Sequence, residues 1–148
     1  MAKHIVIATH SLLAKGLKEA LRFIFEPKGE VHTLCAFIDD TNFEDSISEL
    51  FDSFSPSDTV VVATDITAGS VNKIIASHLA EKNFHLVSGV NLAFLLEISL
   101  ADEEQINAEF INGAITLAKD DIVYMNERIS KQENEIEDFF WINSIGIQ

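Results

Sequence analysis

Two short apolar runs, each followed by a helical pattern, are the features that most constrain how this chain folds. The run 59–64 is β-branched and apolar almost throughout, which is typical of a strand buried on both faces of a parallel sheet. The run 4–9 has a similar composition. After each run, at about 12–25 and 70–82, apolar side chains recur at helical spacing. The chain therefore contains two similar strand–turn–helix units.

The remaining apolar periodicity extends this alternation of strands and helices. It predicts strands at 3–9, 31–37, 59–65 and 84–88, and helices at about 12–25, 41–54, 70–82, 92–101 and 102–125. Alternation of this kind predicts an α/β fold: a doubly wound, mostly parallel sheet with helices on both faces. We expect the strand order 2-1-3-4, in which the order reverses between the first and third strands.

Length and composition limit the classes of protein that the chain can be. Its 148 residues, of which 47% are hydrophobic, are enough for one domain with a full core. There is no apolar run of membrane length, no secretory pattern and only one cysteine, Cys35, so we expect a cytoplasmic protein. The net charge of −14 argues against nucleic acid as a partner, because a phosphate backbone repels such a surface.

The C-terminal segment is aromatic and apolar, directly after an acidic stretch. Residues 139–147 include Phe139, Phe140 and Trp141. Side chains of this kind need burial, against either the sheet or another subunit. We therefore predict a single domain over 1–148, with 126–148 as a C-terminal extension or edge strand. A dimer contact is the alternative role of this tail.

A histidine and an aspartate follow two of the predicted strands. His10 comes after the first strand, and Asp65 ends the third. Because the carboxyl ends of neighbouring parallel strands meet at one edge of a sheet, we expect both side chains to project there. A carboxylate that holds one ring N–H leaves the other imidazole nitrogen free to attack, so we predict His10 as a nucleophile oriented by Asp65. The simpler alternatives are a turn residue for His10 and a helix cap for Asp65.

The other histidines get no functional role from the sequence. His4, His32 and His85 flank or lie in strands and lack the spacing of metal ligands, so we predict no metal site. His78 lies on the apolar face of a predicted helix and is interpreted as a core residue. A glycine-rich nucleotide loop is also absent from the sequence, and we expect no cofactor.

Four segments carry a resemblance to a known family. They are Ile5–His10, then Ala63–Asp65 with Ala68–Asn72, then Ser88–Leu92, and finally Leu95–Glu97. In this order and spacing they resemble the IIA component of the mannose-family bacterial sugar phosphotransferase system, over residues 1 to about 125. The resemblance implies a doubly wound fold and a homodimer. Some members exchange an edge strand between subunits, a part that the tail from Phe139 would play.

The resemblance also implies a phosphotransferase role. His10 would accept a phosphoryl group from the phosphocarrier protein HPr and pass it to a IIB component, with Asp65 orienting the ring. The membrane permease subunits would be indirect partners, and they rather than this chain would contact the sugar. Because the donor is a phosphoprotein, neither a metal ion nor another cofactor is needed.

Residues at the starts of the two helices are the candidates for holding the phosphoryl group. Backbone N–H groups at a helix N-terminus bind phosphate oxygens. We expect such donors after His10 and at Thr67, Gly69 and Ser70, although Ser70 is equally well explained as a helix cap. Ser11 stands where the family usually has glycine, and its hydroxyl is a further candidate donor. Ala68 likewise replaces the first glycine of a Gly-Gly-Ser motif.

Three other assignments compete with this one. The phosphotransfer subunit of a dihydroxyacetone kinase looks similar, but a methionine-glycine-serine loop is expected there and residues 67–70 are Thr-Ala-Gly-Ser. A receiver-like signalling domain would be phosphorylated on Asp65, yet it needs an acidic pair where this chain has Thr9 and His10. A non-catalytic regulatory domain of the same fold that keeps the histidine is the third alternative.

Overall fold

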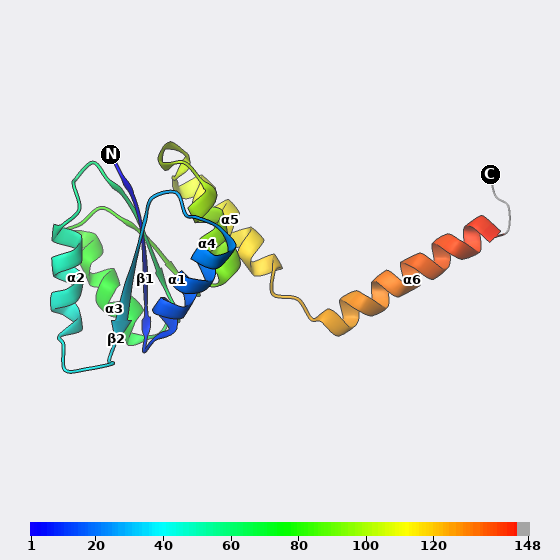
Figure 1. Ribbon diagram of the computed structural model, residues 1–148, viewed down its shortest axis with the longest axis horizontal. Coiled ribbons are helices and arrows are strands. Elements are labelled where there is room, and N and C mark those ends of the chain that lie inside the picture. Colours follow the sequence, from blue (N-terminus) through cyan, green and yellow to red (C-terminus); the bar gives the residue numbers. More distant parts are fainter. Residues whose placement is uncertain (145–148) are drawn as a thin grey trace. The chain divides into compact units, whose positions relative to one another are not determined.

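The computed structural model describes residues 1–144, and it confirms the predicted fold class and strand order. All strand pairs are parallel, in the order β2-β1-β3-β4 (Figure 1). The elements are β1 (Lys3–His10), α1 (Leu13–Ile24), β2 (Glu30–Ala36), α2 (Phe43–Asp52), β3 (Thr59–Thr64), α3 (Ser70–Ser77), β4 (His85–Ser88), α4 (Leu92–Leu100), α5 (Ala108–Asp120) and α6 (Met125–Ser144), with short 3-10 turns at His78–Ala80 and Glu103–Gln105. The contacts divide the chain into two units, 1–118 and 119–148, which are described separately below.

The sheet of the first unit is buried on both faces. In β1, Ile5 and Ile7 point to one face while Val6 and Ala8 point to the other, and all four are fully buried. This alternation is the period-two geometry of a strand. It explains why the apolar run is continuous: both faces need apolar side chains.

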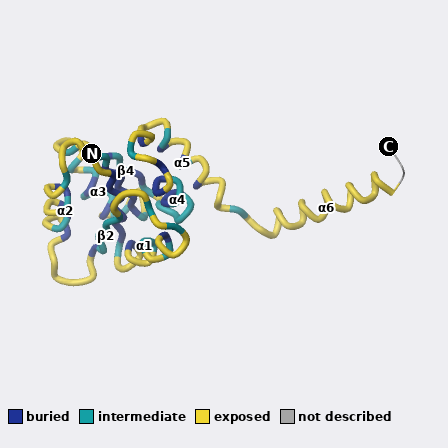
Figure 2. Tube along the Cα trace, turned by 45° about the horizontal axis from the view of Figure 1, so that its top comes forward, coloured by how far each residue is buried: buried dark blue, intermediate teal, exposed yellow. Residues whose placement is uncertain are grey.

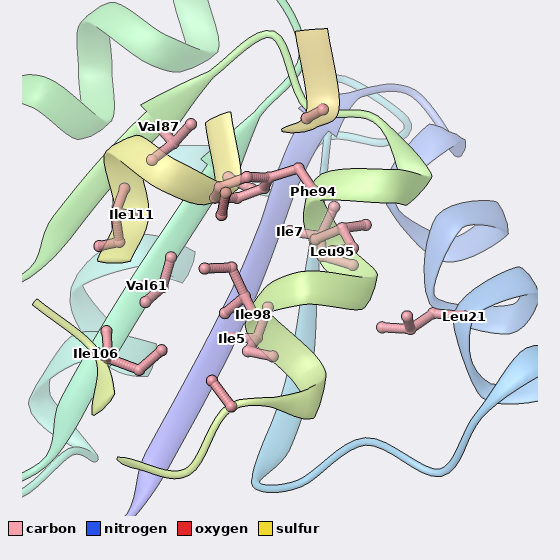
Figure 3. Close-up of a cluster of buried hydrophobic side chains, with 14 of the residues drawn as sticks. Ile5, Ile7, Leu21, Val61, Val87, Phe94, Leu95, Ile98, Ile106 and Ile111 are labelled. Atoms are coloured by element: carbon pink, nitrogen blue, oxygen red, sulfur yellow. The ribbon is translucent and has the colours of Figure 1, made fainter. Parts of the chain in front are cut away.

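A separate apolar cluster covers each face of the sheet. Side chains from α1, α4 and α5 pack on one face, shown in Figure 3, and side chains from α2 and α3 pack on the other. Fully buried members include Leu21 of α1, Leu95 of α4, Ile47 of α2 and Ile75 of α3. Figure 2 shows the same pattern, with buried strands inside exposed helix faces. The two layers hold the strands and therefore fix the loops at the sheet edges.

The helix predicted at 102–125 is interrupted in the structure. Asp102 caps the 3-10 turn Glu103–Gln105 through a capping box, and the side chain of Asn107 then accepts a hydrogen bond from the backbone N–H of Phe110, at 2.9 Å. Polar side chains that bond to the backbone in this way start a new helix rather than continue an old one. As a result, α5 begins at Ala108, and Met125 belongs to α6 instead.

The second unit corrects the prediction of a C-terminal edge strand. Residues 139–144 are the last residues of α6, whose side chains are exposed along its whole length in this chain (Figure 2). The segment Met125–Ser144 contains neither proline nor glycine and is rich in glutamate, lysine and glutamine, which favour helix. The aromatic character of 139–142 suggested a strand, but these residues continue the helix that the preceding ones begin. Residues 145–148 of the predicted strand lie outside the described residues.

No helix within residues 1–144 is both long and apolar enough to cross a membrane.

A buried lysine ties the start of β1 to the end of α4. Lys3 is 4% exposed, and its ammonium donates hydrogen bonds to the carbonyl oxygens of Ile98, at 2.8 Å, and Ala101. The last carbonyls of a helix have no N–H partner within it, so the lysine supplies the missing donors. Burial lowers the pKa of Lys3, and the charge of Lys28 lowers it further, while Asp102 opposes both.

Replacing Lys3 by methionine keeps the apolar stem and removes the donor. We expect Lys3→Met to lower the free energy of unfolding by about 1–3 kcal/mol, the cost of leaving buried carbonyl groups unsatisfied. Urea denaturation followed by circular dichroism measures this change. The matched control is Lys15→Met on the exposed side of α1. Equal losses in the two variants would contradict the capping role of Lys3.

Candidate functional site

The parallel pairing of β1 and β3 brings the two predicted site residues together. His10 is the last residue of β1, and Asp65 directly follows β3. Ala8 pairs with Thr64 in this register, so both strands end at the same edge of the sheet. The His10 side chain is 38% exposed and that of Asp65 is 9% exposed. The imidazole is therefore accessible, whereas its acidic neighbour lies beneath it.

One carboxylate oxygen of Asp65 holds both the backbone and the ring of His10. Oδ2 accepts hydrogen bonds from the His10 backbone N–H and from its ring Nδ1, each at 2.8 Å. The other oxygen, Oδ1, accepts from the backbone N–H of Ile66 at 2.9 Å. An ionised carboxylate can only accept, so Nδ1 must carry the proton in this pair.

Asp65 keeps its negative charge in this setting. Burial on its own would raise the pKa of the carboxyl group. Three hydrogen bonds lower the pKa: they come from the His10 backbone, the His10 ring and the Ile66 backbone. Together they outweigh the effect of burial, so the pKa of Asp65 lies below its usual value. The residue is thus a permanent acceptor for the Nδ1 proton near neutral pH.

The second ring nitrogen of His10 is left with its lone pair. In the neutral ring, a proton on Nδ1 means that Nε2 is an acceptor. The hydroxyl oxygen of Ser70 lies 3.2 Å from Nε2, so it donates to that nitrogen. The site therefore presents a partly exposed imidazole whose Nε2 carries the lone pair. The sequence predicts this juxtaposition of His10 and Asp65, and their catalytic roles stay predictions.

Gly69 allows the loop before α3 to approach the ring. A Cβ atom at this position would lie 3.0 Å from Cε1 of His10 and 3.1 Å from the carbonyl oxygen of Ile66. Both distances are shorter than ordinary carbon contacts, so any larger residue would push the ring or the loop aside. Gly69 and Ser70 are accordingly the two predicted phosphate-site residues that adjoin the His10 ring.

The other two predicted phosphate-site residues bond elsewhere. Thr67 shares a hydrogen bond with the hydroxyl of Ser88, at 2.6 Å, across to the end of β4. The backbone N–H of Ser11 donates to the carbonyl oxygen of Ala36, at 2.9 Å. Ser11 also has a positive φ of 53°, a conformation that glycine adopts more easily. This explains in physical terms why glycine suits that position in the family that the chain resembles.

The structure adds positioning contacts that were not predicted. Asn72 accepts a hydrogen bond from the hydroxyl of Thr64, at 2.8 Å, and donates to the carbonyl oxygen of Thr67, at 3.0 Å, which ties the 65–69 loop to α3. The ring of Phe37 lies beside the imidazole of His10, with 5.7 Å between ring centroids. Asn72 could have been suspected from its place one turn into a helix, but no sequence signal indicates that Phe37 faces His10.

The tautomer of His10 can be measured directly. Long-range ¹H–¹⁵N NMR should show the neutral ring protonated on Nδ1, since Asp65 accepts that proton. Asp65→Asn replaces a pure acceptor with an amide that can donate, so the fraction protonated on Nε2 should rise. Asp58→Asn, far from His10 at the opposite edge of the sheet, should leave the ring signals unchanged. An Asp65→Asn spectrum identical to that of the parent protein would remove Asp65 as the orienting group.

Comparison with known proteins points to one family. The family model described as PTS system fructose IIA component matches residues 4–115, which include His10, Asp65 and the loop between β3 and α3. A solved structure from Klebsiella pneumoniae, described as a phosphoenolpyruvate-dependent sugar phosphotransferase system (PTS) permease, is 34% identical to this chain. Its alignment covers 87% of this chain and 95% of that chain, with a TM-score of 0.78.

More distant structures share the fold alone. The mannose/sorbose specific IIA subunit of the phosphotransferase system from Enterococcus faecalis is 13% identical, with 83% of this chain and 94% of that chain covered and a TM-score of 0.70. A sigma-54 interaction domain protein from the same organism is 12% identical, with coverages of 84% and 96% and a TM-score of 0.58. No curated protein matches the chain in sequence.

Proposed function

Because this chain belongs to the PTS fructose IIA component family, we propose that it is a phosphoryl carrier of bacterial sugar uptake with His10 as the acceptor. The proposed donor is the phosphocarrier HPr, the proposed recipient is a IIB component, and the proposed location is the cytoplasm. The observation that carries the proposal is the state of the imidazole. Asp65 holds Nδ1–H at 2.8 Å, the His10 side chain is 38% exposed, and the lone pair of Nε2 faces the hydroxyl of Ser70.

The transfer step follows from this geometry. Nε2 of His10 attacks the phosphorus atom of the donor phosphohistidine, a new N–P bond forms, and the N–P bond of the donor breaks with its electron pair returning to the donor ring. The phosphorylated His10 ring keeps its proton on Nδ1 and so carries a positive charge. The carboxylate of Asp65 balances that charge at hydrogen-bond distance. The same steps in reverse order deliver the group to the recipient.

The start of α3 is suited to hold the phosphoryl oxygens. The hydroxyl of Ser70 is 3.2 Å from Nε2 and can turn to donate to a phosphoryl oxygen once that nitrogen is bonded to phosphorus. Gly69 leaves space beside Cε1, and the N-terminus of a helix has partial positive charge. Catalysis of phosphoryl transfer depends mainly on such positioning and charge stabilisation.

Exposed apolar side chains beside His10 support a protein as the donor. The large side chains of Leu12, Phe37, Ile38 and Ile66 are each at least half exposed at the ends of β1, β2 and β3. Apolar groups gathered at one edge of a soluble protein are typical of an interaction surface. A small phosphorylated metabolite would be better served by charged groups in a cleft.

The first experiment is phosphorylation of the purified protein with phosphoenolpyruvate, enzyme I and HPr, followed by peptide-level mass spectrometry. We expect one acid-labile, base-stable phosphoryl group on His10. His10→Ala should accept none, while Asp65→Asn should accept it on the order of 10²–10⁴-fold more slowly because ring orientation is lost.

The matched control is His78→Gln, which alters a histidine outside the site and should behave as the parent protein. Gly69→Ala should slow acceptance by displacing the ring, without changing the phosphorylated residue. Full phosphorylation of His10→Ala, or no adduct on a folded sample with several bacterial HPr proteins, would contradict the proposed role.

The proposal extends to the domain organisation and the oligomer. We assign transfer to the domain preceding α6 and treat 126–148 as an extension that mediates a homodimer. In support, α6 exposes apolar side chains that a monomer would leave in water: Ile129, Ile136, Phe139, Phe140, Trp141 and Ile142.

The role of the tail can be tested by deleting residues 139–148. Sedimentation velocity should show a weaker dimer than in the parent protein, because the deletion removes apolar side chains that need burial. Phosphorylation of His10 should continue, since the site is formed by β1, β3 and α3. An unaltered dimer would show that the tail has no part in assembly.

A further inference from the structure

A second cluster of histidine and carboxylate groups lies near the amino ends of β1 and β2, whereas His10 lies at the carboxyl end of β1. His4 is near the start of β1, and β2 contributes Glu30 and His32. His4 pairs with Glu30 in the parallel register, and Val6 pairs with His32. Because side chains two residues apart on a strand share a face, all three project from the same face of the sheet.

The three side chains bring one ligand atom each to a common point. Nδ1 of His4 and Nε2 of His32 are 3.0 Å apart. Oε2 of Glu30 is 3.8 Å from the first nitrogen and 3.6 Å from the second. A tetrahedral zinc ion with bonds of about 2.0–2.1 Å separates its ligand atoms by about 3.3 Å. The three separations bracket that value, so small side-chain movements would complete three corners of a tetrahedron.

A partly buried carboxylate already orients the first of these ligands. Oδ2 of Asp58 accepts a hydrogen bond from Nε2 of His4 at 3.1 Å, which leaves Nδ1 as the lone-pair nitrogen directed at the cluster. Backbone N–H groups of Ala2 and Ser55 hold Asp58 in turn, each at 2.9 Å. Metal-bound histidines almost always donate the N–H of the other ring nitrogen to an acceptor such as a carboxylate or a backbone carbonyl.

The surroundings leave one side of the cluster open. The His4 side chain is 9% exposed and is stacked on the ring of Phe54, with centroids 4.2 Å apart. His32 is 24% exposed and Glu30 is 71% exposed. A metal ion would therefore have an apolar wall behind it and a solvent-facing position for water as the fourth ligand.

From this geometry we propose that His4, Glu30 and His32 bind one Zn²⁺ ion with a water molecule as the fourth ligand. Without metal, His32 donates its Nε2 proton to Nδ1 of His4. On binding, His32 changes tautomer, with its single ring proton moving through solvent to Nδ1, so that both facing nitrogens coordinate the ion as neutral imidazoles. The site joins β1 to β2 at the amino ends of the strands. His10 lies six positions along β1 from His4, roughly 20 Å away, so the metal takes no part in the chemistry of His10.

Zinc titration of the full chain, freed of metal by a chelator and of any histidine tag, tests this site. Isothermal titration calorimetry should give one Zn²⁺ per chain, and the melting temperature should rise with Zn²⁺ because binding favours the folded state. Bound Co²⁺ should give the intense visible absorption of a four-coordinate ion. Asp58→Asn, which changes the partner of His4 but none of the three ligands, should weaken binding by about 10–100-fold.

Ligand variants and matched histidine controls locate the ion. His32→Gln and Glu30→Gln change accessible side chains, so they should fold normally, and each should bind Zn²⁺ at least about tenfold more weakly. His10→Gln and His85→Gln remove histidines outside the cluster and should bind as the parent protein does. Unchanged binding in His32→Gln, loss of binding in His10→Gln, or no saturable binding by the parent protein would each overturn the proposal.

Discussion

The parallel pairing of β1 with β3 is the constraint on which the rest of the structure depends. It is possible only because both strands are apolar on both faces and lie between two layers of helices. The pairing register then determines that His10 and Asp65 reach the same edge. Neither residue could position the other through its own loop, because the two are far apart in sequence. The core therefore places the site, and the loops only complete it.

The two ends of β1 carry the residues of two different clusters. The middle of β1 is fully buried, and its polar residues lie near its two ends, with Lys3 and His4 at one and Thr9 and His10 at the other. A strand fixed by neighbours on both sides changes little when a ligand binds at one end. The fold can thus hold the proposed transfer site at the carboxyl ends of the strands and the proposed metal site at their amino ends without coupling them.

Much of this was predictable from the sequence, and what was not has identifiable causes. Continuous β-branched runs predict buried strands, and a polar residue at the end of each predicts where His10 and Asp65 lie. The cluster of His4 and His32 was missed because it depends on the register in which β1 pairs with β2, which no local pattern reveals. The prediction of a strand was wrong for 139–144 because aromatic composition alone does not separate a strand from a helix.

The two hydrogen bonds to Oδ2 of Asp65 make the alignment of His10 tolerant of motion. Both donors belong to the same residue, one on its main chain and one on its ring. When the two strands shift slightly against each other in thermal motion, the acceptor moves relative to the whole residue rather than to the ring alone. Because both donors bond to the same oxygen, the angle between the imidazole and its own backbone is preserved. The orientation of the His10 ring is therefore set by two hydrogen bonds to one atom rather than by one.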